Sequence, residues 1–146
     1  MTGPDPSHWL HRLTAEEWLA AADTELLHCE ETLGRRAVRA GVTHARRAAG
    51  MAWNALLALA RAPDAKFGRS YMDHVVALAG DDGAPEEIRA AARVLRETPA
   101  APPALIAIGK PDLTVLDQAR RIVDHVRERV AAGRVDRTPP QGLPSP

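Results

Sequence analysis

The residues that decide the fold are Val42 to Ala60, with the sequence VTHARRAAGMAWNALLALA. The segment opens with a Thr-His pair and two arginines and then becomes almost wholly apolar, with alanine as its commonest residue. A helix that is apolar on most of its sides has no stable place on the surface of a small protein. The segment therefore predicts the central helix of a bundle or, alternatively, part of an oligomer interface, and its small side chains let neighbouring helices approach closely.

The composition favours a single helical domain. A chain of 146 residues can bury a core without a metal ion or a disulfide, and few of its residues are aromatic or β-branched. The net charge is 0, so there is no overall basic field that would favour non-specific nucleic-acid binding. The single cysteine, Cys29, excludes an internal disulfide. Because we also predict no signal peptide and no membrane span, we expect a cytoplasmic protein without a membrane partner.

Helical periodicity and capping signals predict five helices. The sequence Thr14-Ala-Glu-Glu17 is a capping box that starts the first helix, and Gly34 ends it. Ser70 caps the third helix, and Gly133 ends the fifth. The predicted helices cover residues 14–34, 36–61, 71–79, 85–95 and 112–132.

Short connections place consecutive helices antiparallel to each other. The predicted fold is therefore all-α, an antiparallel (up-and-down) bundle of about five helices over residues 14–132. Residues 1–13 are expected to form an N-terminal arm. Residues 133–146, which are rich in proline, are expected to form a disordered C-terminal tail.

The charges of the first two predicted helices support a hairpin. The first helix carries acidic residues and no lysine or arginine, whereas several arginines stand at the start of the second. In a hairpin, Glu30 and Glu31 would lie near these arginines. Exposed ion pairs of this kind contribute only about 0–1 kcal/mol each, so they select orientation more than they stabilise. The arginines in question are Arg35, Arg36 and Arg39.

The chain resembles the HEPN family of bacterial and archaeal helical domains over roughly residues 14–132. The resemblance implies an antiparallel bundle that commonly forms homodimers. It also implies a link to RNA cleavage, to nucleotide binding, or to toxin–antitoxin pairs with a nucleotidyltransferase. The residues that carry it are Trp18-Leu19, Ala22-Asp23 and Leu26-Leu27, then His44-Ala45, Ala48-Ala49 and Ala55-Leu56-Leu57, then Tyr71, His74 and Leu78.

Nuclease members of this family use an arginine and a histidine four to six residues apart. Histidine can move the proton of the ribose 2′-hydroxyl, and arginine can stabilise charge on the phosphate. Arg69 and His74 are the best candidates for these catalytic roles, because Arg69 stands at a loop-to-helix junction and Ser70 follows it. The alternative is a structural histidine in the helix packing. The spacing alone decides little in an arginine-rich chain, since it recurs in Arg39/His44 and Arg120/His125.

A second set of candidates lies on the second predicted helix. Arg39, His44, Arg47 and Asn54 could bind a phosphate, a small ligand or a partner protein. The alternative is a solvated face that pairs with the acidic residues of the first helix. Gly50 stands in the same strip and costs about 1 kcal/mol relative to alanine inside a helix. Its presence predicts a close approach of another helix or, alternatively, a ligand packed on the strip.

Neither a metal site nor a cofactor is predicted. His8 and His11 are three residues apart, but two ligands in an N-terminal arm do not make a site. A DinB-like metal-binding bundle, a rival all-helical class, needs three converging histidines, usually with two of them four residues apart on one helix. No two histidines of this chain have that spacing.

The preferred function is a non-enzymatic interaction or regulatory module of the HEPN type. We expect a homodimer, with a nucleotidyltransferase or another protein as its partner. Family members often carry glutamate and lysine where this chain has Gly50 and Asn54, which favours a module without the nuclease apparatus. The alternative is a metal-independent ribonuclease, the toxin of a toxin–antitoxin pair, with RNA as its substrate and Arg69 and His74 as its site.

Overall fold

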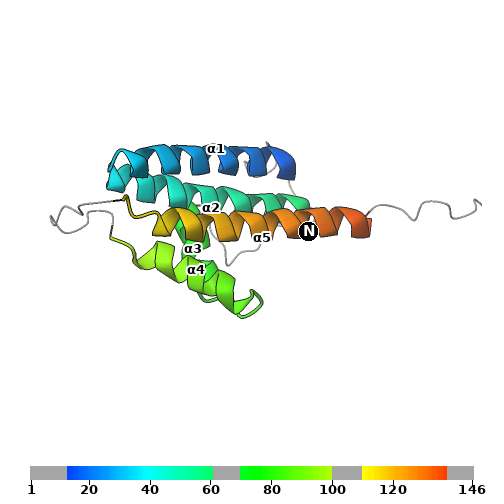
Figure 1. Cartoon of the computed structure of the whole chain (residues 1–146). Coiled ribbons are helices and arrows are strands. Elements are labelled where there is room, and N and C mark those ends of the chain that lie inside the picture. The colour runs from blue at the N-terminus through cyan, green and yellow to red at the C-terminus, as the bar shows by residue number, and fades with distance from the viewer. Residues whose placement is uncertain (1–12, 61–69, 100–109, 138–146) are drawn as a thin grey trace, which may run out of the picture.

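The computed structural model describes residues 13–60, 70–99 and 110–137. These ranges contain five α-helices and no strand, which confirms the predicted all-α helical bundle (Figure 1). None of these helices has the length and apolarity needed to cross a membrane. The predicted N-terminal arm, apart from Leu13, lies outside the described residues. The helices are α1 (Ala15–Gly34), α2 (Val38–Ala60), α3 (Tyr71–Ala79), α4 (Glu86–Glu97) and α5 (Thr114–Arg137).

Helix α2 lies at the centre of the molecule and contacts all four other helices (Figure 1). Every residue from Ala48 to Ala55 is buried, so this part of α2 has no solvent-facing side. Helices α1 and α5 pack on α2 and on each other, while α3 and α4 form a second pair that contacts both α2 and, through α4, α5. The central position predicted for this segment is confirmed.

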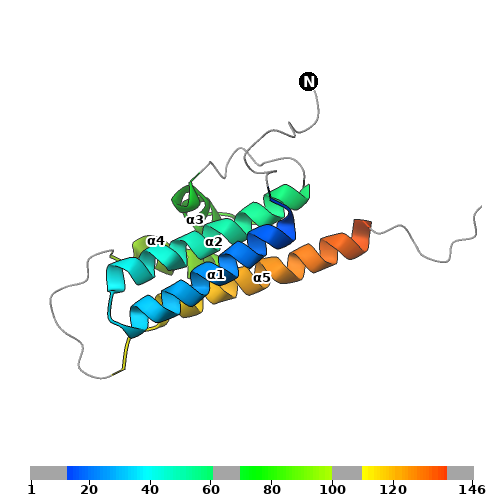
Figure 2. The same ribbon diagram turned by 90° about the horizontal axis from the view of Figure 1, so that it is seen from above.

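The directions of the helices follow from their connections. Residues 35–37 reverse the chain between α1 and α2, which lie antiparallel, and Arg36 takes the left-handed conformation that this short turn requires, with φ of 62°. Helix α5 runs in the same direction as α2, as Figures 1 and 2 show. The reason is that α4 carries the chain back to the end where α2 starts before α5 begins. Strict alternation of direction therefore does not extend to α2 and α5.

The predicted helix starts rest on reciprocal hydrogen bonds. Glu17 N donates to Thr14 Oγ1 at 3.1 Å, and Thr14 N donates to Glu17 Oε1 at 2.9 Å. At the start of α3, Asp73 N donates to Ser70 Oγ at 2.9 Å, and Ser70 N donates to Asp73 Oδ2 at 3.2 Å. Both capping boxes fix where the chain enters a helix, and they confirm the two predicted boundaries.

The end predicted for α5 at Gly133 is wrong, because the helix continues to Arg137. Gly133 lies where α5 passes Leu59 of α2, and a Cβ built on it would be 2.8 Å from Leu59 Cδ2. The glycine therefore permits close helix packing and does not act as a stop signal. Residues 133–137, which were predicted to belong to the tail, are part of α5, and residues 138–146 lie outside the described residues.

The acidic residues of α1 have partners on α5. Arg120 donates to Glu30 at 2.7 Å, and Arg127 donates to Asp23 at 2.6 Å. The sequence placed Glu30 near the arginines at the start of α2, and the structure shows Arg120 of α5 as a partner of Glu30. Helix α5 packs beside α1 and brings its own arginines to the same acidic face.

Candidate functional site

His74 is fully buried between α3 and α2, with only 1% of its surface exposed. Its Nε2 lies 2.8 Å from Oδ1 of Asn54, which is itself 0% exposed. Because an amide oxygen can only accept a hydrogen bond, His74 Nε2 is the donor. The pair is a buried polar link that holds α3 against α2. Arg69, the predicted catalytic partner of His74, lies outside the described residues.

Gly50 stands one turn before Asn54 on α2, and α3 covers α2 at this position as well. A Cβ built on Gly50 would lie 2.7 Å from the Tyr71 Cα atom, so the two backbones touch. The predicted close approach at Gly50 is therefore confirmed, and α3 occupies the strip on which a ligand was the alternative. Asn54, a predicted ligand-binding residue, lies under α3, and its Oδ1 accepts the hydrogen bond from His74.

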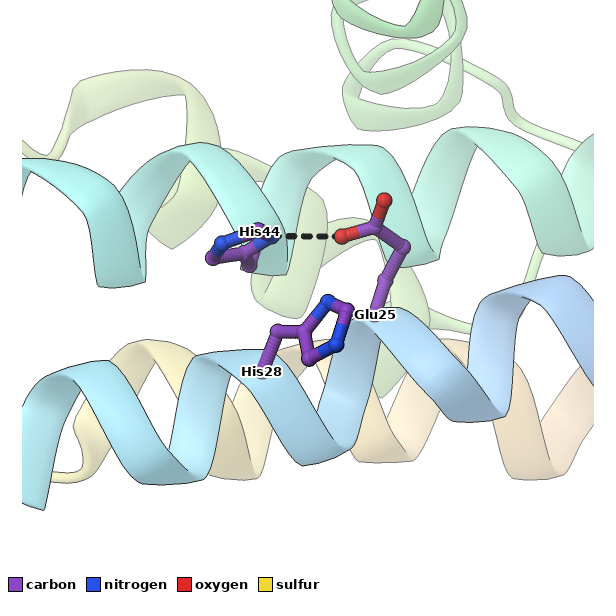
Figure 3. Close-up of side chains that lie close together, drawn as sticks. All are labelled: Glu25, His28 and His44. Carbon is purple, nitrogen blue, oxygen red and sulfur yellow. Dashed lines mark hydrogen bonds and ion pairs between the residues drawn. The ribbon is translucent and has the colours of Figure 1, made fainter.

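A second polar group, which we call the Glu25 cluster, joins α1 to α2. It comprises Glu25, His28 and His44, which Figure 3 shows, and Arg47. Glu25, one of the acidic residues of the first helix, is only 7% exposed. His44 Nδ1 lies 2.5 Å from Glu25 Oε2, and Arg47 Nε lies 3.1 Å from Glu25 Oε1. The rings of His28 and His44 meet edge to face, with centroids 5.2 Å apart. Two predicted residues, His44 and Arg47, thus come together around Glu25, an acid of the first helix, as the alternative of pairing with those acids expected, except that Glu25 is buried.

The environment of the Glu25 cluster is apolar on its inner side and open on its outer side. A buried carboxylate is tolerated only when charged or hydrogen-bonding groups compensate it, and His44 and Arg47 do so here.

Burial raises the pKa of Cys29, which follows His28, to about 11, so this thiol is not a nucleophile at neutral pH. Burial also raises the pKa of Tyr71, with smaller opposing and reinforcing effects of Arg47 and Glu25.

The remaining predicted residues lie apart from one another. Arg39 is exposed and lines, with His44, an open surface hollow of about 530 Å³ at the start of α2. Arg120 pairs with Glu30 on the surface, and burial lowers the pKa of His125, which is only partly exposed. The described structure therefore separates Asn54 from the other predicted binding residues and leaves His44 and Arg47 together.

Glu25 and His28 are the residues that the sequence-based prediction missed. They stand three apart on α1, which places both side chains on one face of a helix. The signal was the sequence Glu25-Leu-Leu-His28, followed by His44 early in the next helix of a hairpin. Histidine spacing alone does not reveal this group, because one of its three members is a carboxylate and the third residue stands on another helix.

Comparison with protein-family models, with curated proteins and with solved structures gives no match. The resemblance to the HEPN family stays a prediction.

Proposed function

We propose that this chain is a non-catalytic interaction module, a cytoplasmic helical bundle of the HEPN type that regulates a partner. The observation that carries the proposal is the burial of His74. With 1% of its surface exposed and its Nε2 bonded to Asn54, His74 cannot reach an RNA phosphate without movement of α3. A general acid or base must lie within hydrogen-bond reach of the reacting proton. The arrangement favours a structural histidine over a catalytic one.

The proposal includes self-association through the outer face of α1. Among the described helices, α1 contacts α2 and α5 only, and its outer face carries Leu27, which is 62% exposed. A leucine on that face can pack against its own copy across a two-fold axis. A nucleotidyltransferase, the partner class that the HEPN resemblance implies, is the second partner that we propose.

The catalytic alternative is tested by incubating the purified chain with total RNA in EDTA. We expect intact RNA, because His74, the histidine of the proposed catalytic pair, is buried and bonded to Asn54. Arg69→Ala and His74→Gln variants, checked for helical content by circular dichroism, serve as comparisons. Cleavage by the unmodified protein that both variants lose would show a metal-independent ribonuclease and would refute the non-catalytic proposal.

Self-association is tested by sedimentation equilibrium. We expect the unmodified chain to form a dimer and Leu27→Glu to shift it towards the monomer, since the new charge would be buried in the interface. Val76→Glu is the matched control, because Val76 is 48% exposed on α3, away from the proposed face. A dimer that Val76→Glu breaks and Leu27→Glu leaves intact would place the interface elsewhere.

A further inference from the structure

We infer that Glu25, His28 and His44 form a binding site for one divalent transition-metal ion, with zinc as the ion expected. The site is independent of the proposed interaction with a partner. It uses residues of two helices that a turn of three residues holds together.

The geometry brings three ligand atoms to one point. Glu25 and His28 project from the same face of α1, and His44 reaches them from α2 (Figure 3). One carboxylate oxygen and one nitrogen of each ring all lie within 4.8 Å of one another. Ligand atoms on a tetrahedral zinc ion are about 3.4 Å apart, as bond lengths of about 2.0–2.2 Å require. Rotations of the two histidine side chains would be needed to bring the three ligand atoms to this spacing.

The chemistry of the donors selects the class of ion. Two imidazoles and one carboxylate are a donor set used by zinc and by other first-row transition metals with three protein ligands. Magnesium and calcium prefer oxygen ligands throughout, so this set discriminates against them. Water would complete the coordination shell at the fourth position.

The carboxylate of the site is buried and held in place, whereas its two histidines are open to solvent. Glu25 is rigidly held, because it is 7% exposed and Arg47 Nε lies 3.1 Å from its Oε1. The other oxygen, Oε2, lies 2.5 Å from His44 Nδ1, and an ion bound between these two atoms would replace that contact. His28 is exposed and the His44 side chain is 23% exposed, so an ion can enter from solvent. Arg47 adds a positive charge nearby, but its own side chain is 46% exposed, where solvent screens it.

The test is a titration of the full chain, without an affinity tag and after removal of EDTA, with zinc followed by calorimetry. We expect one zinc ion per chain in the unmodified protein. His28→Ala should weaken binding by more than about tenfold, because even an outer-shell partner of a metal ligand is worth roughly 10–100-fold in affinity. His28 is exposed, so this variant should keep its fold. Glu25→Gln, which preserves the size of the side chain, should weaken zinc binding as well.

The visible absorption of bound cobalt is a second measurement of the site, and a change in protein stability alone does not produce it. Bound Co²⁺ should show the visible absorption bands of a four- or five-coordinate ion in the unmodified protein and lose them in His28→Ala. The control is the double variant His8→Ala/His11→Ala, which should bind zinc as the unmodified chain does. Equal zinc affinity of His28→Ala and the unmodified chain, loss of binding in the control, or no binding by the unmodified chain would each overturn the proposal.

Discussion

At the scale of single residues, the contact between Gly50 and Tyr71 reverses an ordinary expectation. Glycine to alanine inside a helix normally stabilises by up to about 1 kcal/mol. At Gly50 the added Cβ would lie 2.7 Å from the Tyr71 Cα atom, which is backbone and cannot rotate away. We expect Gly50→Ala to lower the free energy of unfolding by about 1–3 kcal/mol. Gly34→Ala, where no atom lies within 4 Å, is the control and should be neutral or stabilising in urea denaturation.

The buried pair of His74 and Asn54 makes a second prediction. Each single alanine variant leaves a cavity and a buried polar atom without its partner, so each should cost about 2–4 kcal/mol. The double variant removes both polar groups and should cost less than the sum of the two. Urea denaturation of the four proteins measures this coupling. Strict additivity would show that the hydrogen bond contributes nothing to stability.

Some residue roles could be read from the sequence and others could not. The capping residues Thr14 and Ser70 were predictable, because a cap is a local interaction within four residues of chain. The sequence predicted that another helix would come close at Gly50, but not that the neighbour would be Tyr71 of α3. Glu25 was not recognised, because its burial depends on where α2 passes α1, and an acid on an acidic helix gives no local sign of it. Contacts between helices are set by packing that no short window of sequence contains.

At the scale of the elements, α4 ends against a side chain of α2. Arg46 Nε donates to Leu95 O at 2.8 Å, and its Nη2 donates to Thr98 O at 2.7 Å. These carbonyls have no partner within their own helix, so Arg46 supplies the cap. Arg46→Met should lower the free energy of unfolding by about 1–2 kcal/mol, since both carbonyls lose a charged donor.

The control for this variant is Arg39→Met, also on α2. Arg39 is exposed, and substitutions of exposed residues usually change stability by no more than about 0.5 kcal/mol. Thermal denaturation of both variants by circular dichroism distinguishes a capping role from a general effect of removing arginine. Similar losses in both variants would contradict the capping role of Arg46.

Helix α5 carries the group with the clearest dependence on pH. Burial lowers the pKa of His125 below its usual 6.5, and Arg129 lowers it further, while Glu128 and Glu87 act weakly in the opposite direction. Below about pH 6.5 the unfolded chain therefore binds a proton that the folded chain resists, so stability falls as the pH is lowered. We expect His125→Gln to lose less stability than the unmodified chain between about pH 7 and about pH 5. Parallel urea curves at the two pH values check this, and equal losses would contradict it.

The elements themselves were predicted well, except where packing overrides propensity. The positions of all five helices follow from periodicity and from caps, which act within one segment. The continuation of α5 past Gly133 was not predictable, because it depends on the passage of Leu59 beside that glycine. The direction of α5 relative to α2 also depends on the course of the chain between them, which the periodicity of either helix does not record.

At the scale of the whole molecule, the bundle is organised around one helix. A continuous buried stretch from Ala48 to Ala55 made the all-α fold readable, because only a central helix lacks a polar face. The sequence did not decide which helices would be neighbours. That arrangement depends on summed contacts of α1, α3, α4 and α5 with α2 and with one another.

The central place of α2 also determines how its amides meet solvent. Because every other helix covers it, no single helix can move away and expose the stretch from Ala48 to Ala55 on all sides. Its amide hydrogens should exchange with deuterium only when the whole domain opens, whereas those of α1 can exchange through local fraying. Native-state hydrogen exchange would then report the global free energy of unfolding at these eight residues. The stretch from Ala48 to Ala55 should therefore be the most strongly protected segment of the molecule.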